Sequence, residues 1–282
     1  MLRTTMRRGL ALAAVAIAAA FAAAAILAPH GNAGRAVRAI HFATPALTCG
    51  ATIDVSTKLT SDLTGCAGTG LTITADHVLL DLNGHTISGT GNATGVAIGA
   101  ASDTVENGLV QDFVKGITIA AGPTSGGRVQ AIRSIDNVDG IDVNGDNAVV
   151  TASFVAHNAS NGIGVIGNHD QLTNNWIRSN QGRGILVTNL ATAATVSGNK
   201  VLSNALEGVF VNNAPGSVVT SNTANANGSH GIEANGPVSV SKNAASFNTG
   251  AGIDADWLTT DGGGNHAAEN GKLHQCENLV CS

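Results

Sequence analysis

A chain of 282 residues with 36 glycines, no tyrosine, 3% aromatic and 12% charged residues cannot fill the core of an ordinary globular domain with large side chains. Its formal net charge of −5 argues against nucleic acid as a partner, because proteins that bind the phosphate backbone carry basic patches. Such a composition favours a core built from many small, repeated layers, so internal repeats are the first pattern to seek.

The N-terminal segment is typical of a secretory signal peptide. Three arginines precede an apolar run over residues 10–27, and small residues follow it up to Ala33. We expect cleavage after Ala33, which removes the three arginines and no carboxylate and so changes the formal charge from −5 to −8. The apolar run is long enough to span a bilayer, so a retained membrane anchor is the alternative. After cleavage we expect a secreted, extracellular protein with no stable membrane partner.

The exported part is expected to be one domain. Residues 34–45 are a linker, residues 46–275 form a repeat array with its N-terminal cap, and residues 276–282 form a C-terminal end closed by a disulfide. One glycine per unit aligns the repeats at intervals of 21 to 25 residues, at Gly70, Gly95, Gly116, Gly140, Gly162, Gly184, Gly208, Gly231 and Gly252. This regular spacing predicts a solenoid.

Each glycine leads a short strand with one buried face. An apolar, a variable and a second apolar residue follow it, as in Ile185-Leu186-Val187, and this period of two is typical of a strand. The apolar residues form two columns, from Leu71 to Ile253 and from Ile73 to Ala255. With no helical period between the strands, these columns predict an all-β parallel solenoid of about nine to ten coils, with neighbouring strands about 4.8 Å apart.

Two asparagine-rich columns precede the glycines. The ninth residue before each glycine is Asn107, Ala131, Ser153, Asn175, Asn199, Asn222 and Asn243, and the fourth is Asp112, Asp136, Asn158, Asn180, Asn204, Asn227 and Asn248. Asparagine suits bends because its side chain bonds backbone groups locally, and stacked amides can bond coil to coil. We therefore predict a structural ladder that includes Asn158, Asn180, Asn204, Asn227 and Asn248. Asn265 and Asn270 repeat the spacing and predict a last partial coil.

Four cysteines flank the array. Cys49 and Cys66 lie near its start and Cys276 and Cys281 at its end, each pair close in sequence. In an exported chain this arrangement predicts two local disulfides. Free thiols or a metal site are the alternatives, but the pairs lie at opposite ends of the array and neither has the C-x-x-C spacing.

The array also carries three recognisable motifs, which are Cys49-Gly50-Ala51-Thr52-Ile53, Gly70-Leu71-Thr72-Ile73 and Leu80-Asp81-Leu82-Asn83-Gly84-His85-Thr86-Ile87-Ser88-Gly89. With them, residues 46–275 resemble the right-handed parallel β-helix proteins of the pectin-lyase-like superfamily, in particular the bacterial group with NosD-type (PbH1) repeats. The resemblance implies a right-handed coil, which periodicity alone leaves open. It implies no single activity, because that superfamily contains lyases, hydrolases, epimerases, tailspikes and proteins without an established activity.

None of the catalytic motifs of that superfamily is complete in this chain. The hydrolase set of Asn-Thr-Asp, Asp-Asp, Gly-His-Gly and Arg-Ile-Lys has one faint counterpart, Ser229-His230-Gly231, and the epimerase Asp-Pro-His-Asp is absent. The lyases use clustered carboxylates for Ca²⁺ and a basic residue, whereas no arginine follows Arg183. The NosD family is linked to the maturation of copper sites. In this chain both methionines lie in the signal peptide, so the mature protein has no thioether ligand for copper. We therefore assign no catalytic residue and no metal ligand.

The outward face of the glycine-led strands supplies one candidate ligand site. It combines an apolar spot with carboxylates and has no matching basic column, and its residues are Leu186, Phe210, Glu233, Asp254 and Asp256. Glu233 and Asp254 would lie about 5 Å apart on neighbouring coils, where carboxylates repel unless a cation or donor lies between them. A Ca²⁺ or acid/base site is the functional interpretation, and a solvated polar face is the alternative.

Three classes of function remain. We favour a secreted or cell-surface module that binds glycans as a monomer and needs no cofactor, with Ca²⁺ as the one ion its acidic face could hold. A polysaccharide lyase or hydrolase with an unrecognised acidic site is the second class, and a structural spacer is the third.

Overall fold

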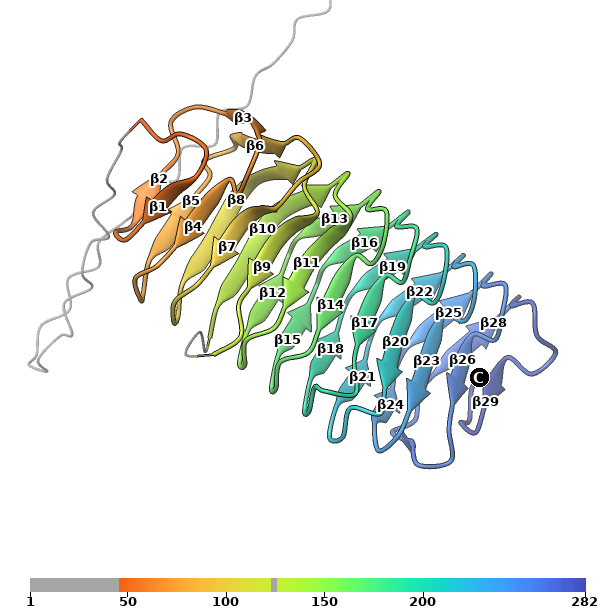
Figure 1. Cartoon of the computed structure of the whole chain (residues 1–282). Coiled ribbons are helices and arrows are strands. Elements are labelled where there is room, and N and C mark those ends of the chain that lie inside the picture. The colour runs from red at the N-terminus through yellow and green to blue at the C-terminus, as the bar shows by residue number, and fades with distance from the viewer. Residues whose placement is uncertain (1–45, 123–125) are drawn as a thin grey trace, which may run out of the picture. The chain divides into compact units, whose positions relative to one another are not determined.

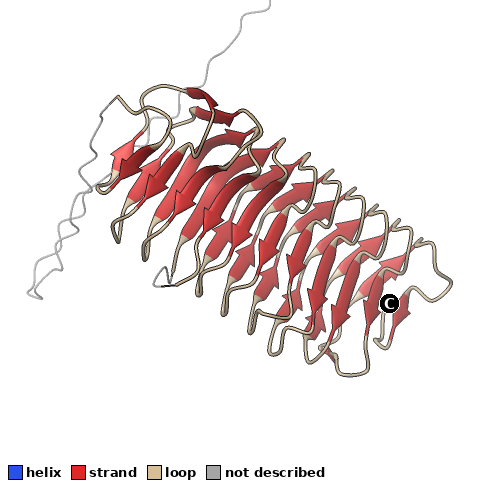
Figure 2. Cartoon of the chain, viewed as in Figure 1, coloured by secondary structure: helices blue, strands red, loops and turns tan. Residues whose placement is uncertain are grey.

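The computed structural model describes residues 46–122 and 126–282, and all regular structure in this part is β-strand (Figures 1 and 2). The chain forms a right-handed parallel β-solenoid of about ten turns, as predicted. The predicted signal peptide (1–33) and linker (34–45) lie outside the described residues. Within those residues, no helix has the length and apolar character needed to cross a membrane.

Each turn contributes one strand to an 11-stranded parallel sheet, here called sheet 1, which faces the viewer in Figure 1. Its strands are β1 (Ala51–Ile53), β4 (Leu71–Ile73), β7 (Thr94–Ile98), β9 (Lys115–Ile119), β11 (Asp139–Val143), β14 (Ile163–Val165), β17 (Ile185–Val187), β20 (Val209–Asn212), β23 (Ile232–Asn235), β26 (Ile253–Ala255) and β29 (Cys276–Glu277). The glycine-led strands lie in register, so that Ile163, Ile185 and Val209 stack with no exposed surface. The two predicted apolar columns therefore line the core.

A second parallel sheet, sheet 2, closes the rest of each turn with two strips of strands. Strip 2a contains β2 (Thr57–Lys58), β5 (Leu79–Asp81), β12 (Val149–Thr151), β15 (Gln171–Thr173), β18 (Thr195–Ser197), β21 (Val218–Thr220), β24 (Ser239–Ser241) and β27 (Thr260–Asp261). Strip 2b contains β3 (Leu63–Cys66), β6 (Thr86–Gly89), β13 (Phe154–Ala156), β16 (Trp176–Arg178), β19 (Lys200–Leu202), β22 (Thr223–Asn225), β25 (Ala244–Ser246) and β28 (His266–Ala268). Two longer strands, β8 (Thr104–Gln111) and β10 (Arg128–Ile135), run through both strips.

The bend after strip 2b carries a continuous asparagine ladder. Asn204 Oδ1 accepts hydrogen bonds from the backbone N (3.1 Å) and from Nδ2 (2.9 Å) of Asn180, and Asn204 donates in the same way to Asn227. The ladder runs through Asn137, Asn158, Asn180, Asn204, Asn227, Asn248 and Asn270 and ends on Gln275. A second ladder, between the two strips, runs through Ser153, Asn175, Asn199, Asn222, Asn243 and Asn265. Both give buried backbone N–H groups an acceptor in the following turn.

The sequence alignment was wrong by one residue in the two turns that lead to Gly116 and Gly140. The residues placed in the ladders there, Asn107, Asp112, Ala131 and Asp136, instead occupy the left-handed position just before them, with φ between 50° and 62°. The ladder residue is the next one, as Asn137 shows by donating its backbone N–H to Asn158. These two turns have one residue fewer between the bend and the glycine, so counting back from Gly140 misses the bend.

The repeated glycines are needed because the backbone passes very close to the neighbouring turn. A Cβ on Gly184 would lie 2.3 Å from Val201 Cγ1 and 2.6 Å from the carbonyl oxygen of Gly208. By contrast, a Cβ on Gly164, which lies at an outward strand position, would have only one atom within 4 Å, Asp142 Oδ1 at 3.6 Å. The glycine column is thus a packing requirement at the corner between strip 2b and sheet 1.

Two buried carboxyl groups lie at the bend that leads from sheet 1 into strip 2a. Asp103 and Asp170 are 0% and 1% exposed. One oxygen of each accepts a backbone N–H of the preceding turn, from Val78 (2.9 Å) and Ala148 (2.7 Å), whereas Oδ2 of each has no partner in the described residues. Burial raises the pKa of both carboxyl groups, and that of Asp170 to about 7.

Both predicted disulfides are present, Cys49–Cys66 at the first turn and Cys276–Cys281 at the last. They indicate an oxidising, extracytoplasmic location. The last bridge begins in β29, which pairs with β26, so sheet 1 continues into the segment expected to be only a closed end. Asn265 and Asn270 extend the two ladders into this region, as the predicted last partial coil requires.

Candidate functional site on sheet 1

Four of the five predicted site residues lie in one outward column of sheet 1. Leu186, Phe210, Glu233 and Asp254 are paired in register across β17, β20, β23 and β26. Glu277 on β29 continues the column beyond Asp254. The strands hold these side chains about 4.8 Å apart, on a rigid surface rather than on loops.

Asp256 follows directly after β26 and lies outside this column. Its Oδ1 accepts the backbone N–H groups of Leu258 (2.9 Å) and Thr259 (3.1 Å), and its Oδ2 accepts that of Gly236 (2.7 Å). An aspartate that bonds the backbone two and three residues later caps a turn. Its place in the candidate site stays a prediction, and both of its oxygens already accept hydrogen bonds that shape the loop after β26.

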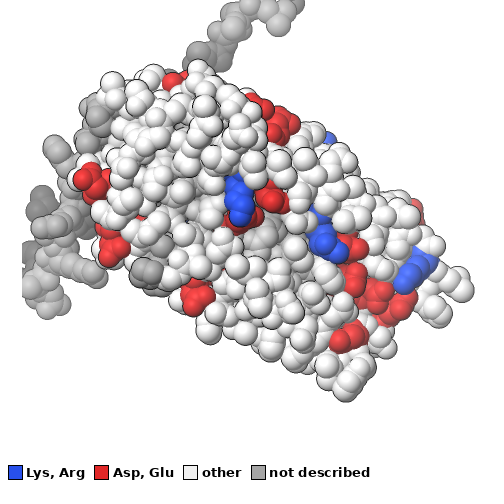
Figure 3. Space-filling view, in the orientation of Figure 1, with Lys and Arg blue, Asp and Glu red and all other residues white. Residues whose placement is uncertain are grey.

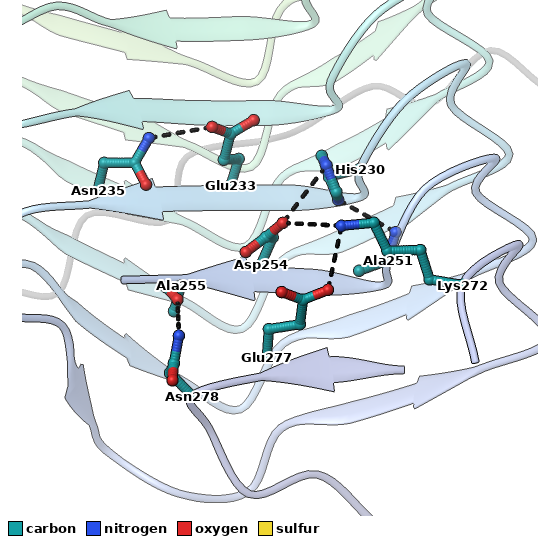
Figure 4. Close-up of polar contacts among 9 residues, drawn as sticks. All are labelled: His230, Glu233, Asn235, Ala251, Asp254, Ala255, Lys272, Glu277 and Asn278. Atoms are coloured by element: carbon teal, nitrogen blue, oxygen red, sulfur yellow. Dashed lines mark hydrogen bonds and ion pairs between the residues drawn. The ribbon is translucent and has the colours of Figure 1, made fainter. Parts of the chain in front are cut away.

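One lysine contacts these carboxylates, although the face has no matching basic column. Lys272 Nζ lies 3.3 Å from Asp254 Oδ2 and 3.0 Å from Glu277 Oε1, and it bridges the two strands (Figure 4). The hydrogen bond to Glu277, and then that to Asp254, raises the pKa of Lys272, so this cation stays charged. Lys272 comes from the loop before β29, and it relieves the repulsion between the carboxylates of the column.

His230 joins the same cluster. Its Nδ1 accepts the backbone N–H of Ala251 at 3.0 Å, so the other ring nitrogen, Nε2, carries the proton and points at Asp254 Oδ2, 3.4 Å away (Figure 4). Both nitrogens are thus engaged, which leaves this imidazole as a positioning group rather than a free base. Glu233 Oε1 accepts Asn235 Nδ2 at 3.0 Å. In the described residues, Glu233 Oε2 and Asp254 Oδ1 are free to accept hydrogen bonds from a ligand.

Phe210 belongs to the predicted apolar spot, and the Arg183 guanidinium covers its ring. The Arg183 guanidinium lies 4.6 Å from the centre of its ring, and Arg183 Nε lies 2.8 Å from Glu207 Oε2. Stacking on the ring and the ion pair hold the guanidinium in place. The apolar spot is therefore smaller than expected, and a fixed set of N–H donors lies beside it.

The same pairing occurs further along the sheet. Lys115 Nζ lies 2.7 Å from Asp142 Oδ2; burial raises the pKa of Asp142, and the hydrogen bond to Asp142 raises that of Lys115. On the face drawn in Figure 3, the three large blue patches of Lys or Arg lie against red patches of Asp or Glu. Sheet 1 therefore presents alternating donors and acceptors rather than an acidic surface.

No group of three or more His, Cys, Asp and Glu side chains in residues 46–122 and 126–282 is arranged to hold a metal ion. What the face can do is bind polar groups through a straight row of carboxylates, one lysine and one guanidinium. Sequence reasoning missed Lys272 and Glu277. Strand β29 has Gln275 at the position where a glycine leads most of the other strands of sheet 1, so the glycine spacing does not identify it. Lys272 lies in a loop and reaches the column through its long side chain.

Solved structures with similar folds include three named proteins. A variant of the periplasmic alginate epimerase AlgG has a TM-score of 0.60 at 14% identity, covering 85% of this chain and 74% of its own. The Dettilon tailspike protein has a TM-score of 0.55 at 16% identity, covering 85% of this chain and 59% of its own. Pectate lyase Pel9A has a TM-score of 0.52 at 15% identity, covering 81% and 69%. At such identities the likeness shows the fold alone.

The chain thus spans less than two thirds of the tailspike it resembles. No curated protein matched the sequence. The family model described as "Right handed beta helix region" matches residues 46–201 and 139–263, which together cover most of the chain. The protein belongs to the right-handed β-helix family.

Proposed function

We propose that this protein is an exported, surface-associated module that binds a polysaccharide along the outward face of sheet 1, from Arg183 to Glu277. One observation carries the proposal. Three carboxylates, Glu233, Asp254 and Glu277, lie in register on neighbouring strands about 4.8 Å apart, and they continue a column that begins with Leu186 and Phe210. Sugar hydroxyl groups are donors and acceptors at regular intervals along a polymer, so a repetitive surface suits a repetitive ligand.

The polar groups of the face are fixed before any ligand arrives. Lys272 is held between two carboxylates, and Arg183 is held between Phe210 and Glu207. Binding would therefore cost little side-chain entropy, which favours affinity. The likeness in fold to an alginate epimerase and a pectate lyase, whose names refer to polysaccharides, supports the same class of ligand. The two disulfides support secretion.

The test is a glycan array together with a polysaccharide degradation screen on the purified chain. We expect at least one polysaccharide to bind without being degraded. The double variant Glu233→Gln and Asp254→Asn should then lose at least tenfold in affinity, because it removes two anionic acceptors and keeps their shape. Asp136→Asn, at an exposed bend outside sheet 1, is the matched control and should bind normally.

Other results would overturn or change the proposal. If nothing on the array binds, the protein is a structural spacer. If a polysaccharide is cleaved, the face is the site of a lyase or hydrolase. Adding CaCl₂ or EDTA tests whether Ca²⁺ takes part. A rise in melting temperature with Ca²⁺ that the double variant abolishes would assign an ion to Glu233 and Asp254.

A further inference from the structure

A row of cations and aromatic rings crosses the outward face of strip 2b, away from sheet 1. Arg133 on β10, Phe154 on β13, Trp176 on β16 and Lys200 on β19 are paired in register, and Figure 1 shows these four strands in succession. Trp176 is the eighth residue before its glycine, Gly184, and the same count from Gly140 gives Ile132. Ile132 is instead buried (1% exposed), because the bend before it lies one residue later than predicted.

The two rings support each other. Their centres lie 5.5 Å apart with an angle of 86° between the planes, and the Arg133 guanidinium lies 5.8 Å from the centre of the Phe154 ring. Trp176 is 45% exposed although it lies in a strand. The edge-to-face contact and the strand fix the orientation of the indole, so a large apolar surface is held open to solvent.

The cations of this face differ from those of sheet 1. On sheet 1, Lys115, Arg183 and Lys272 are all ion-paired. In the described residues, by contrast, no ion pair within 4.0 Å involves Arg133, Lys200 or the neighbouring Arg178. Unpaired cations gathered around an exposed tryptophan, in a chain with a net charge of −5, form a local basic patch on an acidic protein.

We propose that strip 2b is a second, independent binding surface, and that it takes an anionic polysaccharide. The apolar C–H face of a pyranose ring would pack on the Trp176 indole. Carboxylate or sulfate groups on the same polymer would meet Lys200 on one side of the indole and Arg133 on the other, about 5 Å and about 10 Å away along the solenoid. The surface goes beyond the function proposed for sheet 1 and does not depend on it.

Tryptophan fluorescence tests this surface directly. The chain has two tryptophans, Trp176 and Trp257, so a Trp257→Phe variant leaves Trp176 as the sole reporter. We expect dextran sulfate or polygalacturonate to change its emission and neutral dextran or methyl-esterified polygalacturonate to leave it unchanged. Comparison of the two anionic polymers shows whether sulfate or carboxylate is preferred. Affinity should fall as NaCl rises, because exposed charges are screened.

Variants separate this surface from general charge effects. In the Trp257→Phe background, Arg133→Gln with Lys200→Gln should weaken binding at least tenfold and remove most of its salt dependence. Lys242→Gln changes charge at a bend far from the rings and should have little effect. With an affinity gel in place of fluorescence, Trp176→Ala should weaken binding while Trp176→Phe keeps part of it.

The proposal fails if neither anionic polymer changes the emission of Trp176, or if Lys242→Gln weakens binding as much as the double variant does. It is also overturned if the Glu233→Gln and Asp254→Asn variant, on sheet 1, abolishes the Trp176 response. Loss of binding by that variant on the glycan array, with the Trp176 response intact, would instead concern sheet 1 alone. The two surfaces can therefore be judged separately.

Discussion

Replacing Asp170 by asparagine should stabilise the solenoid above neutral pH. The amide keeps an oxygen to accept the Ala148 N–H and places a donor where the carboxyl group has an unpartnered Oδ2. Asn199, in the ladder between strips 2a and 2b, shows the arrangement that an amide can make, with Nδ2 2.8 Å from the Leu172 carbonyl oxygen. Removing a buried ionisable group without losing its hydrogen bond should favour the folded state.

The size of the effect follows from the pKa of Asp170, which folding raises from 3.8 to about 7. Each pKa unit corresponds to about 1.4 kcal/mol, so a rise of about 3 units makes the ionised carboxyl group cost about 4 kcal/mol above pH 7. Because the folded pKa is the higher one, the folded state binds more protons between the two values. The protonated Asp170 carboxyl group therefore makes its full contribution to stability below about pH 4, and this contribution is lost as the pH rises to about 7.

Urea unfolding at several pH values between 4 and 8 measures the difference. The stabilisation by Asp170→Asn should be close to zero at the acid end and should grow to its full value above pH 7. Asp136→Asn makes the same chemical change at an exposed bend and should give no such trend. A gain that is independent of pH, or a loss of stability at pH 8, would refute the reasoning about the buried carboxyl group.

Three further changes test the fold. Asn204→Leu should lower the free energy of unfolding by about 1 to 3 kcal/mol in thermal unfolding, because the two donors of Asn180 lose their acceptor. An unchanged melting temperature would mean that this amide does not stabilise the fold. Gly184→Ala should lower the free energy of unfolding by about 1 to 3 kcal/mol through overpacking, whereas Gly164→Ala should change it by less than about 0.5 kcal/mol. Equal effects of the two substitutions would contradict the close approach of the backbone at Gly184. Replacing Cys276 and Cys281 by serine should lower the free energy of unfolding by about 2 kcal/mol, the value expected for so short a loop, and should speed hydrogen exchange in the last turn. Unchanged exchange would show that the disulfide does not stabilise that end.

The solenoid could be predicted because its core repeats a short local rule. Ile185 and Val187 face inward for the same reason in every turn, so the period of two and the glycine spacing identify sheet 1 without knowledge of any distant contact. The error near Asp136 has the opposite cause. A single deleted residue between a bend and its glycine leaves the columns on either side intact, and only the hydrogen bond of Asn137 reveals the true position of the bend.

The candidate site was less predictable because its character depends on long side chains and loops. The column from Leu186 to Asp254 follows from strand register. The pairing of Lys272 with Asp254 and the stacking of Arg183 on Phe210 depend on the reach of flexible side chains, which sequence offsets do not encode. The capping role of Asp256 could not be predicted because it depends on the conformation of the loop after β26. The Arg133 and Trp176 row was hidden by the misplaced bend.

The direction of the asparagine ladder has a consequence for how such proteins change length. Each amide accepts from the turn before it, and the series stops where Gln275 Oε1 takes both donors of Asn270, at 2.9 Å each. Any turn between these limits presents the same bonding pattern at its two ends. Duplication or deletion of a gene segment that encodes one whole turn would therefore join without an orphaned amide, whereas a deletion that removes a ladder asparagine would leave the backbone N–H of the preceding turn without its acceptor. Evolution can lengthen or shorten the two sheets in steps of one turn, provided that Gln275 and its disulfide-bonded end remain in place.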